Sequence, residues 1–530
     1  MDREQYKEAL NLFKGYIYDT EVTELKVDPI YHNIYKYLMQ PSKEDLCFSS
    51  AFIVLLVQLS RPLNFYRFYI DLYQESNKPH VPMNVYGINI LRSGGGKGLS
   101  NNIMNNLLDF DYAKSEYISQ MGSDLLGQSD DVDEKKKIEK NFSKLKKIVC
   151  AEEQASATTA GMRLINEDLL TVYSDLAIGE EKQVGSAFFN IQELADNLEN
   201  TNSYDKDFFS TLKEMYDLGN FSAKALKTGV LSAIRNFYIS FLGATTDKTL
   251  QENPEVSRLL KNFFVSGHAR RSLVCMPAKS EFDIVCSKQK KTDGLTLREM
   301  FEVKKFVEDE NVKLVKEQVK NNIRKFAVDA RMGRKSIKLT DECYFYYVIY
   351  KLLCAERAKS VNNGILALET ENRFWKALKI SGILAIYGGA TEISEDYFCE
   401  AVKIVEYYAH HFKRFLNNRV SDVNDKIVEL LLDSQKDGKP CGITNLALRT
   451  NNEVNSYRKE SVTSSDFIKK AMKDVEENLD KIGYQLFVEK KGYRGKTTVF
   501  AAIPNDWVNP KMSDEEPYYV WDDVPKGEEQ

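Results

Sequence analysis

One short segment constrains the fold of this chain more than any other, because an apolar stretch, a glycine-rich loop and a helical pattern follow each other directly. The stretch MNVYGINIL (83–91) is typical of a buried strand, and SGGGKG (93–98) comes almost immediately after it. LSNNIMNNLLDF (99–110) then predicts a helix. This order is the context that a phosphate-binding loop requires, because the loop amides and the helix N-terminus together attract phosphate.

The loop itself matches the motif G-x-x-x-x-G-K-[ST] only in part. Gly96 and Lys97 fit it, whereas Leu91 occupies the first glycine position and Gly98 replaces the usual serine or threonine. A glycine-rich turn with an exposed lysine is the alternative on the motif alone. The flanking strand and helix favour phosphate binding, and the residues that we expect to bind ATP here are Ser93, Gly94, Gly95, Gly96, Lys97 and Gly98.

Composition excludes few functions. The 530-residue chain has a net charge of -5 and 43% apolar residues, which is typical of a soluble protein with several domains. The N-terminus does not resemble a signal peptide, and the longest apolar run, AFIVLLVQL (51–59), is too short to span a bilayer and predicts a buried helix. The eight cysteines form no C-x-x-C pair. We therefore expect a cytoplasmic protein (in the host-cell cytoplasm if it is viral) with reduced cysteines and no membrane partner.

Apolar strands alternate with helical segments along residues 81–295. GSAFFNI (185–191) is followed by a glutamine and a glutamate, and NFYISFLGATT (236–246) ends in two threonines. A further apolar run follows GHARRS (267–272), while the highly charged residues 128–147 predict a solvated helix or a surface insertion. Strands that alternate with helices predict a parallel sheet with helices on both faces, and hence the α/β class.

A nucleoside triphosphatase also needs a carboxylate at the end of a second strand, where it positions magnesium or activates water. Glu193 is the charged residue in that position, since Gln192 stands where an aspartate is usual. Glu152 and Glu153 compete for the role after a short strand expected at KKIVCA (146–151). Glu193 also fits a first-turn acid of the following helix. We predict that Glu193 is catalytic and that Gln192 lies in the ATP site, with Mg²⁺ as cofactor and its ligands unassigned.

Two further segments carry polar groups that suit the same site. Thr245 and Thr246 end a strand, where a hydroxyl can sense the γ-phosphate, and a simple helix cap is the alternative. Arg270 and Arg271 precede the next apolar run. An arginine from a neighbouring subunit stabilises transition-state charge, and a surface salt bridge is the alternative. We predict Thr245 as an ATP-binding residue and Arg270 as a catalytic one, and we favour the salt bridge for Arg271.

The C-terminal third has a different pattern. Apolar spacing is helical from about residue 296 to 417, and residues 421–503 then predict three helices followed by two strands, which is winged-helix order. A protein-interaction module is the alternative to DNA binding. The acidic, aromatic end (511–530) predicts a disordered tail that either contacts replication partners or is inert. The residues of the wing that we expect to bind DNA are Lys490, Lys491, Arg494 and Lys496.

The succession of these motifs resembles a P-loop ATPase family of phages, prophages and mobile elements. The segments that carry the likeness, within residues 45–417, are ILRSGGGKG, FFNIQELADNL, ISFLGATTDKTL, FFVSGHARRSLVCMP and ALKISGILAIYGGATEISEDYFCEAVKIVEYYAHHF. The family is domain-of-unknown-function family 3987, which is related to primase–helicases and replicative helicases. The resemblance implies a P-loop NTPase core of the additional-strand, AAA+-like class with a helical lid. It matches Lys97 to the loop lysine, Glu193 to the acidic residue of the second motif and Arg270 to the arginine before the next strand.

The resemblance also implies work on DNA. In ring helicases of this type a loop or hairpin inserted after the second motif points into the pore, and GNFSAKALKTG (219–229) occupies that place. We predict that Lys224 and Lys227 contact DNA, and two solvated lysines are the alternative. The expected protein is an ATP-dependent replicative helicase that forms a homo-oligomeric ring, such as a hexamer, on single-stranded or forked DNA. The alternative is a nucleotide-dependent DNA-binding, helicase-loader or regulatory protein with a degenerate ATP site.

The expected organisation follows these changes of pattern. It comprises an N-terminal helical region (1–80), a P-loop ATPase core (81–295), a helical lid (296–420), a winged-helix domain (421–510) and an acidic disordered tail (511–530).

Overall fold

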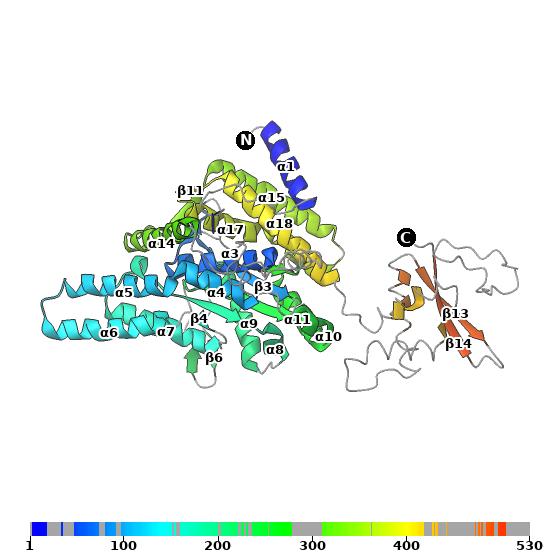
Figure 1. Ribbon diagram of the computed structural model, residues 1–530, viewed down its shortest axis with the longest axis horizontal. Coiled ribbons are helices and arrows are strands. Elements are labelled where there is room, and N and C mark those ends of the chain that lie inside the picture. The colour runs from blue at the N-terminus through cyan, green and yellow to red at the C-terminus, as the bar shows by residue number, and fades with distance from the viewer. Residues whose placement is uncertain are drawn as a thin grey trace, which may run out of the picture. The chain divides into compact units, whose positions relative to one another are not determined.

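The structure is a computed structural model that describes most of the chain up to residue 417 and shorter stretches after it (Figure 1). The described residues are 3–18, 33–34, 47–73, 80–91, 97–150, 153–154, 159–199, 203–220, 224–226, 229–231, 236–252, 254–277, 310–361, 363–417, 427–428, 430–432, 441–442, 472, 475–476, 479–480, 484–491 and 497–504. The chain divides into two compact units, of which unit 1 spans Met1–Thr249 and Glu255–Leu416, and unit 2 spans Leu250–Pro254 and Asn417–Gln530.

A five-stranded parallel sheet forms the centre of unit 1, as the alternation of strands and helices predicted. Four of its strands have four to nine residues, and the fifth, at one edge, has only two. This confirms the α/β class. The strands in spatial order are β4 (Glu153–Gln154), β5 (Ser186–Ile191), β8 (Tyr238–Thr246), β3 (Tyr86–Leu91) and β9 (Ser272–Cys275).

The register of this sheet decides which residues meet at each end. Leu91, the last residue of β3, pairs with Thr246, the last residue of β8. Ile191, the last residue of β5, pairs with Gly243 of β8. The carboxyl ends of these three strands therefore lie at one edge of the sheet, which we call the carboxyl edge.

Helix α3 (Phe48–Phe65) packs against four of the five strands and is buried along nearly its whole length. It is long and apolar enough to cross a membrane, but 94% of that window is buried inside unit 1, as expected of a core helix. Gly87 of β3 allows the close approach, because a Cβ there would lie 2.9 Å from Cγ2 of Val57 on the helix. The buried helix predicted at 51–59 is thus confirmed, and it belongs to the core of the sheet.

A second, four-stranded sheet joins segments that are far apart in the sequence. Its order is β11 (Glu392–Ile393), β10 (Ser336–Leu339), β1 (Tyr69–Asp71) and β2 (His80–Pro82). β1 runs parallel to β10 and antiparallel to β2. The expectation that the segments 1–80 and 296–417 are wholly helical was therefore wrong: β10 alternates exposed and buried residues, which is the strand period of two.

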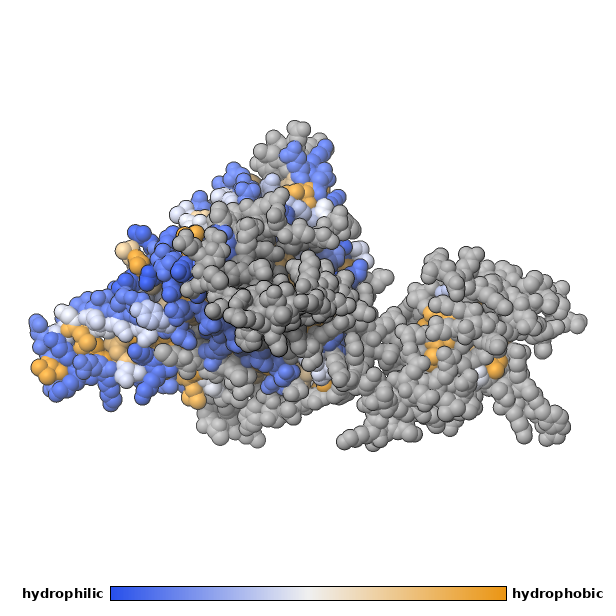
Figure 2. Space-filling model, viewed as in Figure 1, coloured by the Kyte–Doolittle hydropathy of each residue, from blue (hydrophilic) through white to orange (hydrophobic). Residues whose placement is uncertain are grey.

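α4 (Lys97–Leu108) packs against α3 in the body of unit 1. The helices after it, α5 (Phe110–Leu126), α6 (Val132–Cys150) and α7 (Thr159–Asp175), extend from the sheet as a mainly hydrophilic arm (Figures 1 and 2). α6 confirms the solvated helix predicted at 128–147. It also corrects the strand expected at 146–151, because Leu145 and Val149 are buried at the four-residue spacing of a helix and the chain stays helical to Cys150.

Further elements lie mainly between β5 and β9, and residues 250–254 of this part belong to unit 2. Between β5 and β9 the chain forms α8 (Leu194–Glu199), α9 (Ser203–Leu218), a hairpin of β6 (Lys224–Leu226) and β7 (Gly229–Leu231), α10 (Asp247–Glu252), α11 (Pro254–Phe263) and the π-helical turn η3 (Phe264–His268). A short 3₁₀ turn, η2 (Glu180–Lys182), precedes β5. α1 (Arg3–Tyr18) packs against α15, where Phe13 contacts the rings of Tyr346 and Tyr350.

The helices described in the last part of unit 1 are α14 (Glu310–Arg331), α15 (Asp341–Lys359), α16 (Gly364–Glu371), α17 (Arg373–Tyr387) and α18 (Glu395–Asn417). α17 is almost entirely buried and is fixed to the rest of the unit by two lysines. The Nζ of Lys379 donates to the carbonyl of Tyr216 (2.6 Å), and that of Lys376 donates to the carbonyl of Ser272 (3.2 Å). α17 therefore contacts the sheet at the amino end of β9, the end opposite the carboxyl edge.

Unit 2 contains a three-stranded antiparallel sheet with its own core. The strands, in spatial order, are β12 (Cys441–Gly442), β14 (Thr497–Pro504) and β13 (Tyr484–Lys491). Helical residues between 427 and 432 and between 472 and 480 pack their apolar side chains against Phe500 and Ala502 of β14. The first helical stretch precedes β12, and the second precedes the β13–β14 hairpin.

Candidate functional site

The carboxyl edge of the five-stranded sheet holds the described residues of the predicted ATP site. Open α/β sheets bind ligands outside the carboxyl ends of their strands. Here β3 ends at Leu91 and α4 begins at Lys97, so a strand and a helix flank the glycine loop as predicted. Ser93, Gly94, Gly95 and Gly96 lie outside the described residues. Lys97 and Gly98 are described as the first two backbone positions of α4, where helix N–H groups are available to an anion.

Gln192 and Glu193 follow β5 at the same edge. The amide of Gln192 donates from Nε2 to Oδ1 of Asn190. Asn190 in turn donates from Nδ2 to Oε1 of Glu153 (3.0 Å), so the competing carboxylate Glu153 is engaged in this contact. Glu193 is exposed in the turn before α8, and its carbonyl accepts the backbone N–H and the side-chain amide of Asn197. Both carboxylates are exposed, and Glu193 is the one that directly follows a long strand.

A polar network continues from Glu153 into the helix that begins at Lys97. Arg61 lies 3.6 Å from Glu153 and donates from Nη1 to Oδ1 of Asn105 on α4 (2.9 Å). It also donates to Oε1 of Gln58 (2.8 Å), whose amide bonds to Asn101 of α4. We call these residues, with Asn190 and Gln192, the Arg61 network. The network connects the end of β5 to α4, and therefore fixes the second strand relative to the helix behind the glycine loop.

The sequence-based prediction missed Arg61 and its partners, although the sequence contains an indication of them. Arg61 is only 3% exposed and lies over the ring of Phe188, with its guanidinium carbon 4.4 Å from the ring centroid. Arginine is almost never fully buried unless it is paired. A charged residue and Gln58 within an otherwise apolar helix therefore indicate a buried polar contact, but the sequence does not name the partners.

The two threonines at the end of β8 have different environments. Thr246 Oγ1 accepts the backbone N–H of Thr249 (3.1 Å), so the helix-cap alternative holds for Thr246. Thr245 is 1% exposed, and its hydroxyl has no hydrogen-bond partner among the residues that the structure describes. It pairs with Ile90, one residue before the end of β3. An unsatisfied buried hydroxyl costs about 1–3 kcal/mol, so this position favours a bound acceptor.

Arg270 and Arg271 lie at the opposite end of the sheet. β9 begins at Ser272, which pairs with Tyr86, the first residue of β3. Because β3 has six residues at about 3.3 Å each, Arg270 is separated from the carboxyl edge of its own sheet by about 20 Å. Arg270 therefore does not share a site with Lys97, Gln192, Glu193 and Thr245 of the same chain.

The turn before β9 holds a small cluster of cations. Arg271 is 4% exposed and donates to Oδ2 of Asp217 (2.8 Å), so the favoured salt bridge is present, though it is buried rather than on the surface. Burial, and then the charge of Arg271, lowers the pKa of the half-buried Arg270. The cluster sits on a π-helical turn whose Gly267 has a φ of 111°, a conformation that favours glycine.

The predicted DNA contacts are described only in part. A β-hairpin does form at 224–231, with Lys224 opposite Leu231 and a two-residue connection at 227–228 (Figure 1). Lys224 is described as a backbone position of β6, and Lys227 lies outside the described residues. In unit 2, Lys490 and Lys491 are the last two positions of β13. Arg494, Lys496 and the segment 511–530 also lie outside the described residues.

Mg²⁺ would meet few protein ligands at this edge. In the described part of the chain, His, Cys, Asp and Glu form no group of three or more that could hold a metal ion. Mg²⁺ that binds with a nucleotide needs only one or two carboxylates, because phosphate oxygens and water supply the rest. Glu193 fits that requirement. Comparisons of the chain with protein-family models, with curated proteins and with solved structures found no match.

Proposed function

We propose that this protein is a P-loop ATPase of the additional-strand class that works on DNA, and that it acts as a ring-forming replicative helicase of a phage or mobile element. The strand order carries the proposal. β8 lies between β3, which leads into the glycine loop, and β5, which leads into Gln192 and Glu193. A strand added between these two is what gives the additional-strand class its name, and the sheet has this arrangement with all strands parallel.

In the proposed site each residue has one task. The amides of residues 93–98 and the N-terminus of α4 hold the phosphates, and Lys97 adds its charge at the β- and γ-phosphates. Thr245 donates its unpaired hydroxyl to the γ-phosphate. Glu193 accepts a proton from the attacking water and orients it. Mg²⁺ neutralises charge on the phosphates when it binds with ATP. The Arg61 network keeps α4 and β5 at a fixed separation.

Two features support DNA as the substrate of the mechanical work. The β6–β7 hairpin lies between the second and third strands of the motif order, where ring helicases of this type present a pore hairpin, and it carries Lys224 and Lys227. In unit 2, β12 lies between two described helical stretches and pairs with the second strand of the hairpin, a pairing that supports the proposed winged helix. A basic wing of Lys490, Lys491, Arg494 and Lys496 suits phosphate contacts.

The test is ATP hydrolysis by the full chain, measured with and without single-stranded DNA. We expect hydrolysis that DNA stimulates, and a loss of at least about 100-fold in Lys97→Ala, since the transition-state charge then loses its positively charged side-chain partner. Lys140→Ala, which changes an exposed lysine on α6, is the matched control and is expected to keep full activity. DNA-stimulated hydrolysis that survives Lys97→Ala unchanged would contradict the proposal.

One observation favours a second candidate, a nucleotide-dependent DNA-binding or helicase-loader protein. Gln192 stands where a carboxylate is usual, and its amide is bound to Asn190, so it adds no negative charge for Mg²⁺. Such a protein binds ATP without measurable turnover. Binding of a fluorescent ATP analogue that is lost in Lys97→Ala, together with no phosphate release from the wild type, selects this candidate over the helicase.

A further inference from the structure

Two buried cations lie close together where β1 and β10 begin. Arg67 precedes β1 and Lys335 precedes β10, and the side chains are 7% and 6% exposed. Both donate to Gln183, which precedes β5: Nη1 of Arg67 to Oε1 (3.2 Å) and Nζ of Lys335 to the backbone carbonyl (2.7 Å). Burial, and then the charge of Arg67, lowers the pKa of Lys335, which agrees with two neighbouring positive charges. We call Arg67 and Lys335 the cation pair.

The guanidinium of Arg67 has an unused edge. Its Nε and Nη2 are buried and have no hydrogen-bond partner among the described residues. These two nitrogens direct parallel N–H groups from the same edge of the guanidinium, the fork that binds a small anion through two hydrogen bonds. Glu180 and Glu181 act on the cation pair from the exposed turn η2, but the described part of the chain contains no ion pair between them and either cation.

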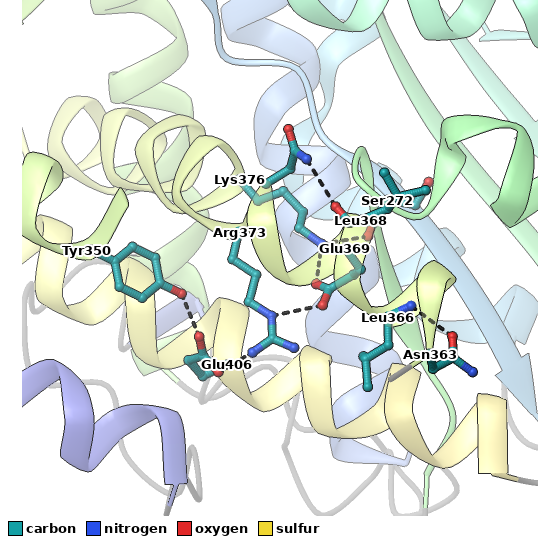
Figure 3. Close-up of polar contacts among 10 residues, drawn as sticks. Ser272, Tyr350, Asn363, Leu366, Leu368, Glu369, Arg373, Lys376 and Glu406 are labelled. Carbon is teal, nitrogen blue, oxygen red and sulfur yellow. Dashed lines mark hydrogen bonds and ion pairs between the residues drawn. The ribbon is translucent and has the colours of Figure 1, made fainter. Parts of the chain in front are cut away.

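A second buried arginine shows how this chain neutralises such a charge elsewhere. Arg373 is 6% exposed and donates from Nε to Glu369 (2.8 Å) and from Nη1 to Glu406 (2.7 Å; Figure 3). Lys376 donates to the other oxygen of Glu369 (2.6 Å; Figure 3). Two buried cations there share two buried carboxylates, whereas the cation pair is bound only to amide oxygens. Because buried charges are normally paired, the cation pair requires a negative charge that these contacts do not supply.

The backbone of Arg67 gives an independent indication that its side chain has a role. Helix α3 ends with the N–H of Phe68 bonded to the carbonyl of Leu63 (2.8 Å) and the N–H of Arg67 bonded to that of Asn64 (3.0 Å). These two bonds form a Schellman motif, in which the position of Arg67 is usually glycine. Arg67 has a φ of 59°, a left-handed conformation that is unfavourable for a residue with a Cβ. The guanidinium therefore explains this arginine better than the turn does.

We propose that the cation pair binds a small monovalent anion such as chloride, which the Nε and Nη2 edge of Arg67 holds and the charge of Lys335 attracts. Phosphate fits less well, because this edge and one ammonium group offer few donors for its four oxygens. The cation pair lies where β1 and β10 begin, whereas Lys97 follows the carboxyl end of β3. The anion site is thus separate from the ATP site and does not depend on ATP hydrolysis.

The test is the melting temperature of the full chain without nucleotide, at constant ionic strength, as chloride replaces gluconate. Gluconate is too large for a site between side chains that are so deeply buried. A ligand of the folded state stabilises it by mass action, so raising chloride from about 1 to about 100 mM should raise the melting temperature by about 2 °C or more. Arg67→Met should lose this dependence, because the fork is gone, and Lys335→Met should reduce it.

Lys338→Met is the matched control, because it removes a lysine of β10 whose side chain is 52% exposed, and it should keep the full chloride dependence. Each protein is compared with itself in the two salts, so a change in the basal stability of a variant does not affect the result. Anomalous scattering from wild-type crystals in bromide locates the anion directly, and a peak should lie against Nε and Nη2 of Arg67. Equal chloride dependence in Arg67→Met and the wild type, or no bromide at this edge, overturns the proposal.

Discussion

At the residue scale, Lys335 is a buried cation whose charge depends on pH near neutrality. It is 6% exposed and donates from Nζ to the carbonyl of Gln183 (2.7 Å). Burial, and then the charge of Arg67, lowers its pKa from 10.5 to about 7. Above pH 7 the folded lysine loses its proton while the unfolded lysine keeps one. The free energy of unfolding should therefore rise with pH above 7, by up to about 1.4 kcal/mol per pH unit from this residue.

We expect Lys335→Met to remove this dependence. The variant should gain stability relative to the wild type at pH 6.5, where most of the buried lysine is charged, and lose about 2 kcal/mol of that advantage by pH 8.5. Urea unfolding of both proteins at pH 6.5, 7.5 and 8.5 measures the difference, and Lys338→Met, which changes a lysine of β10 whose side chain is 52% exposed, is the matched control. Parallel pH profiles for Lys335→Met and the wild type would show that Lys335 is not the group that titrates.

For single residues, the sequence predicts where a side chain lies in the fold better than it predicts which residues that side chain contacts. Glu193 and Thr245 are found from their places at strand ends, and the structure does put both at the carboxyl edge. The hydrogen-bond partners of buried polar residues cannot be predicted in this way, because a hydrogen bond can join residues at any distance in the sequence. Arg61 and Glu153 illustrate this, since they lie 3.6 Å apart although Arg61 belongs to α3 and Glu153 to β4. The places of Glu193 and Thr245 at strand ends could therefore be predicted from the sequence. The Arg61 network could not, and neither could the lack of a hydrogen-bond partner for Thr245 among the described residues.

At the element scale, the approach of α3 to the sheet depends on Gly87. A Cβ at this position of β3 would lie 2.9 Å from Cγ2 of Val57 and 3.2 Å from Cγ1 of Ile53. Gly87→Ala should therefore push the helix from the strand and destabilise unit 1 by about 1–3 kcal/mol, as overpacking does. Val57→Ala removes the crowded methyl group, so the double variant should be more stable than the sum of the two single changes predicts.

Denaturant unfolding of the two single variants and the double variant gives the coupling energy, which we expect to exceed about 0.5 kcal/mol in the stabilising direction. Gly364→Ala is the control, because a Cβ at the first residue of α16 meets no atom within 4 Å. Strictly additive effects at Gly87 and Val57 would mean that the strand and helix relax independently of this contact.

Elements were predictable where they are long. The strands that carry the sheet and the helices α3, α6, α17 and α18 follow from apolar spacing alone. The short strands β1 and β10 were not foreseen, because three or four residues carry too little periodicity and their formation depends on pairing with each other. The opposite error occurred at 146–151, where an apolar end of a long amphipathic helix has the composition of a strand.

At the scale of the whole molecule, the two ends of the sheet have different roles in the proposed ATPase. Lys97, Glu193 and Thr245 belong to the carboxyl edge, whereas Arg270 precedes β9 at the amino end. A chain of this design cannot bring its own Arg270 to its own ATP. If Arg270 takes part in hydrolysis, it serves the site of the next subunit, and each active site is shared between two chains.

Mixing two inactive variants tests this arrangement. Lys97→Ala should destroy the site at the carboxyl edge, and Arg270→Ala should leave that edge intact but deprive the neighbouring site of its arginine. When the two are mixed and allowed to exchange subunits, an interface that joins Lys97 of one variant to Arg270 of the other is complete. In a random 1:1 mixture about a quarter of the interfaces have this composition, so about a quarter of wild-type hydrolysis should return.

The measurement is steady-state phosphate release at a fixed total concentration, with each variant alone as the baseline. Arg271→Ala is an unsuitable partner, because that arginine is bound to Asp217 and its loss would disturb the turn itself. Asn262→Ala, an exposed change at the end of α11, is the matched control and should keep full activity without a partner. A mixture that stays at the baseline, although subunit exchange is demonstrated by fluorescence transfer between labelled chains, would rule out Arg270 as a residue that acts in trans.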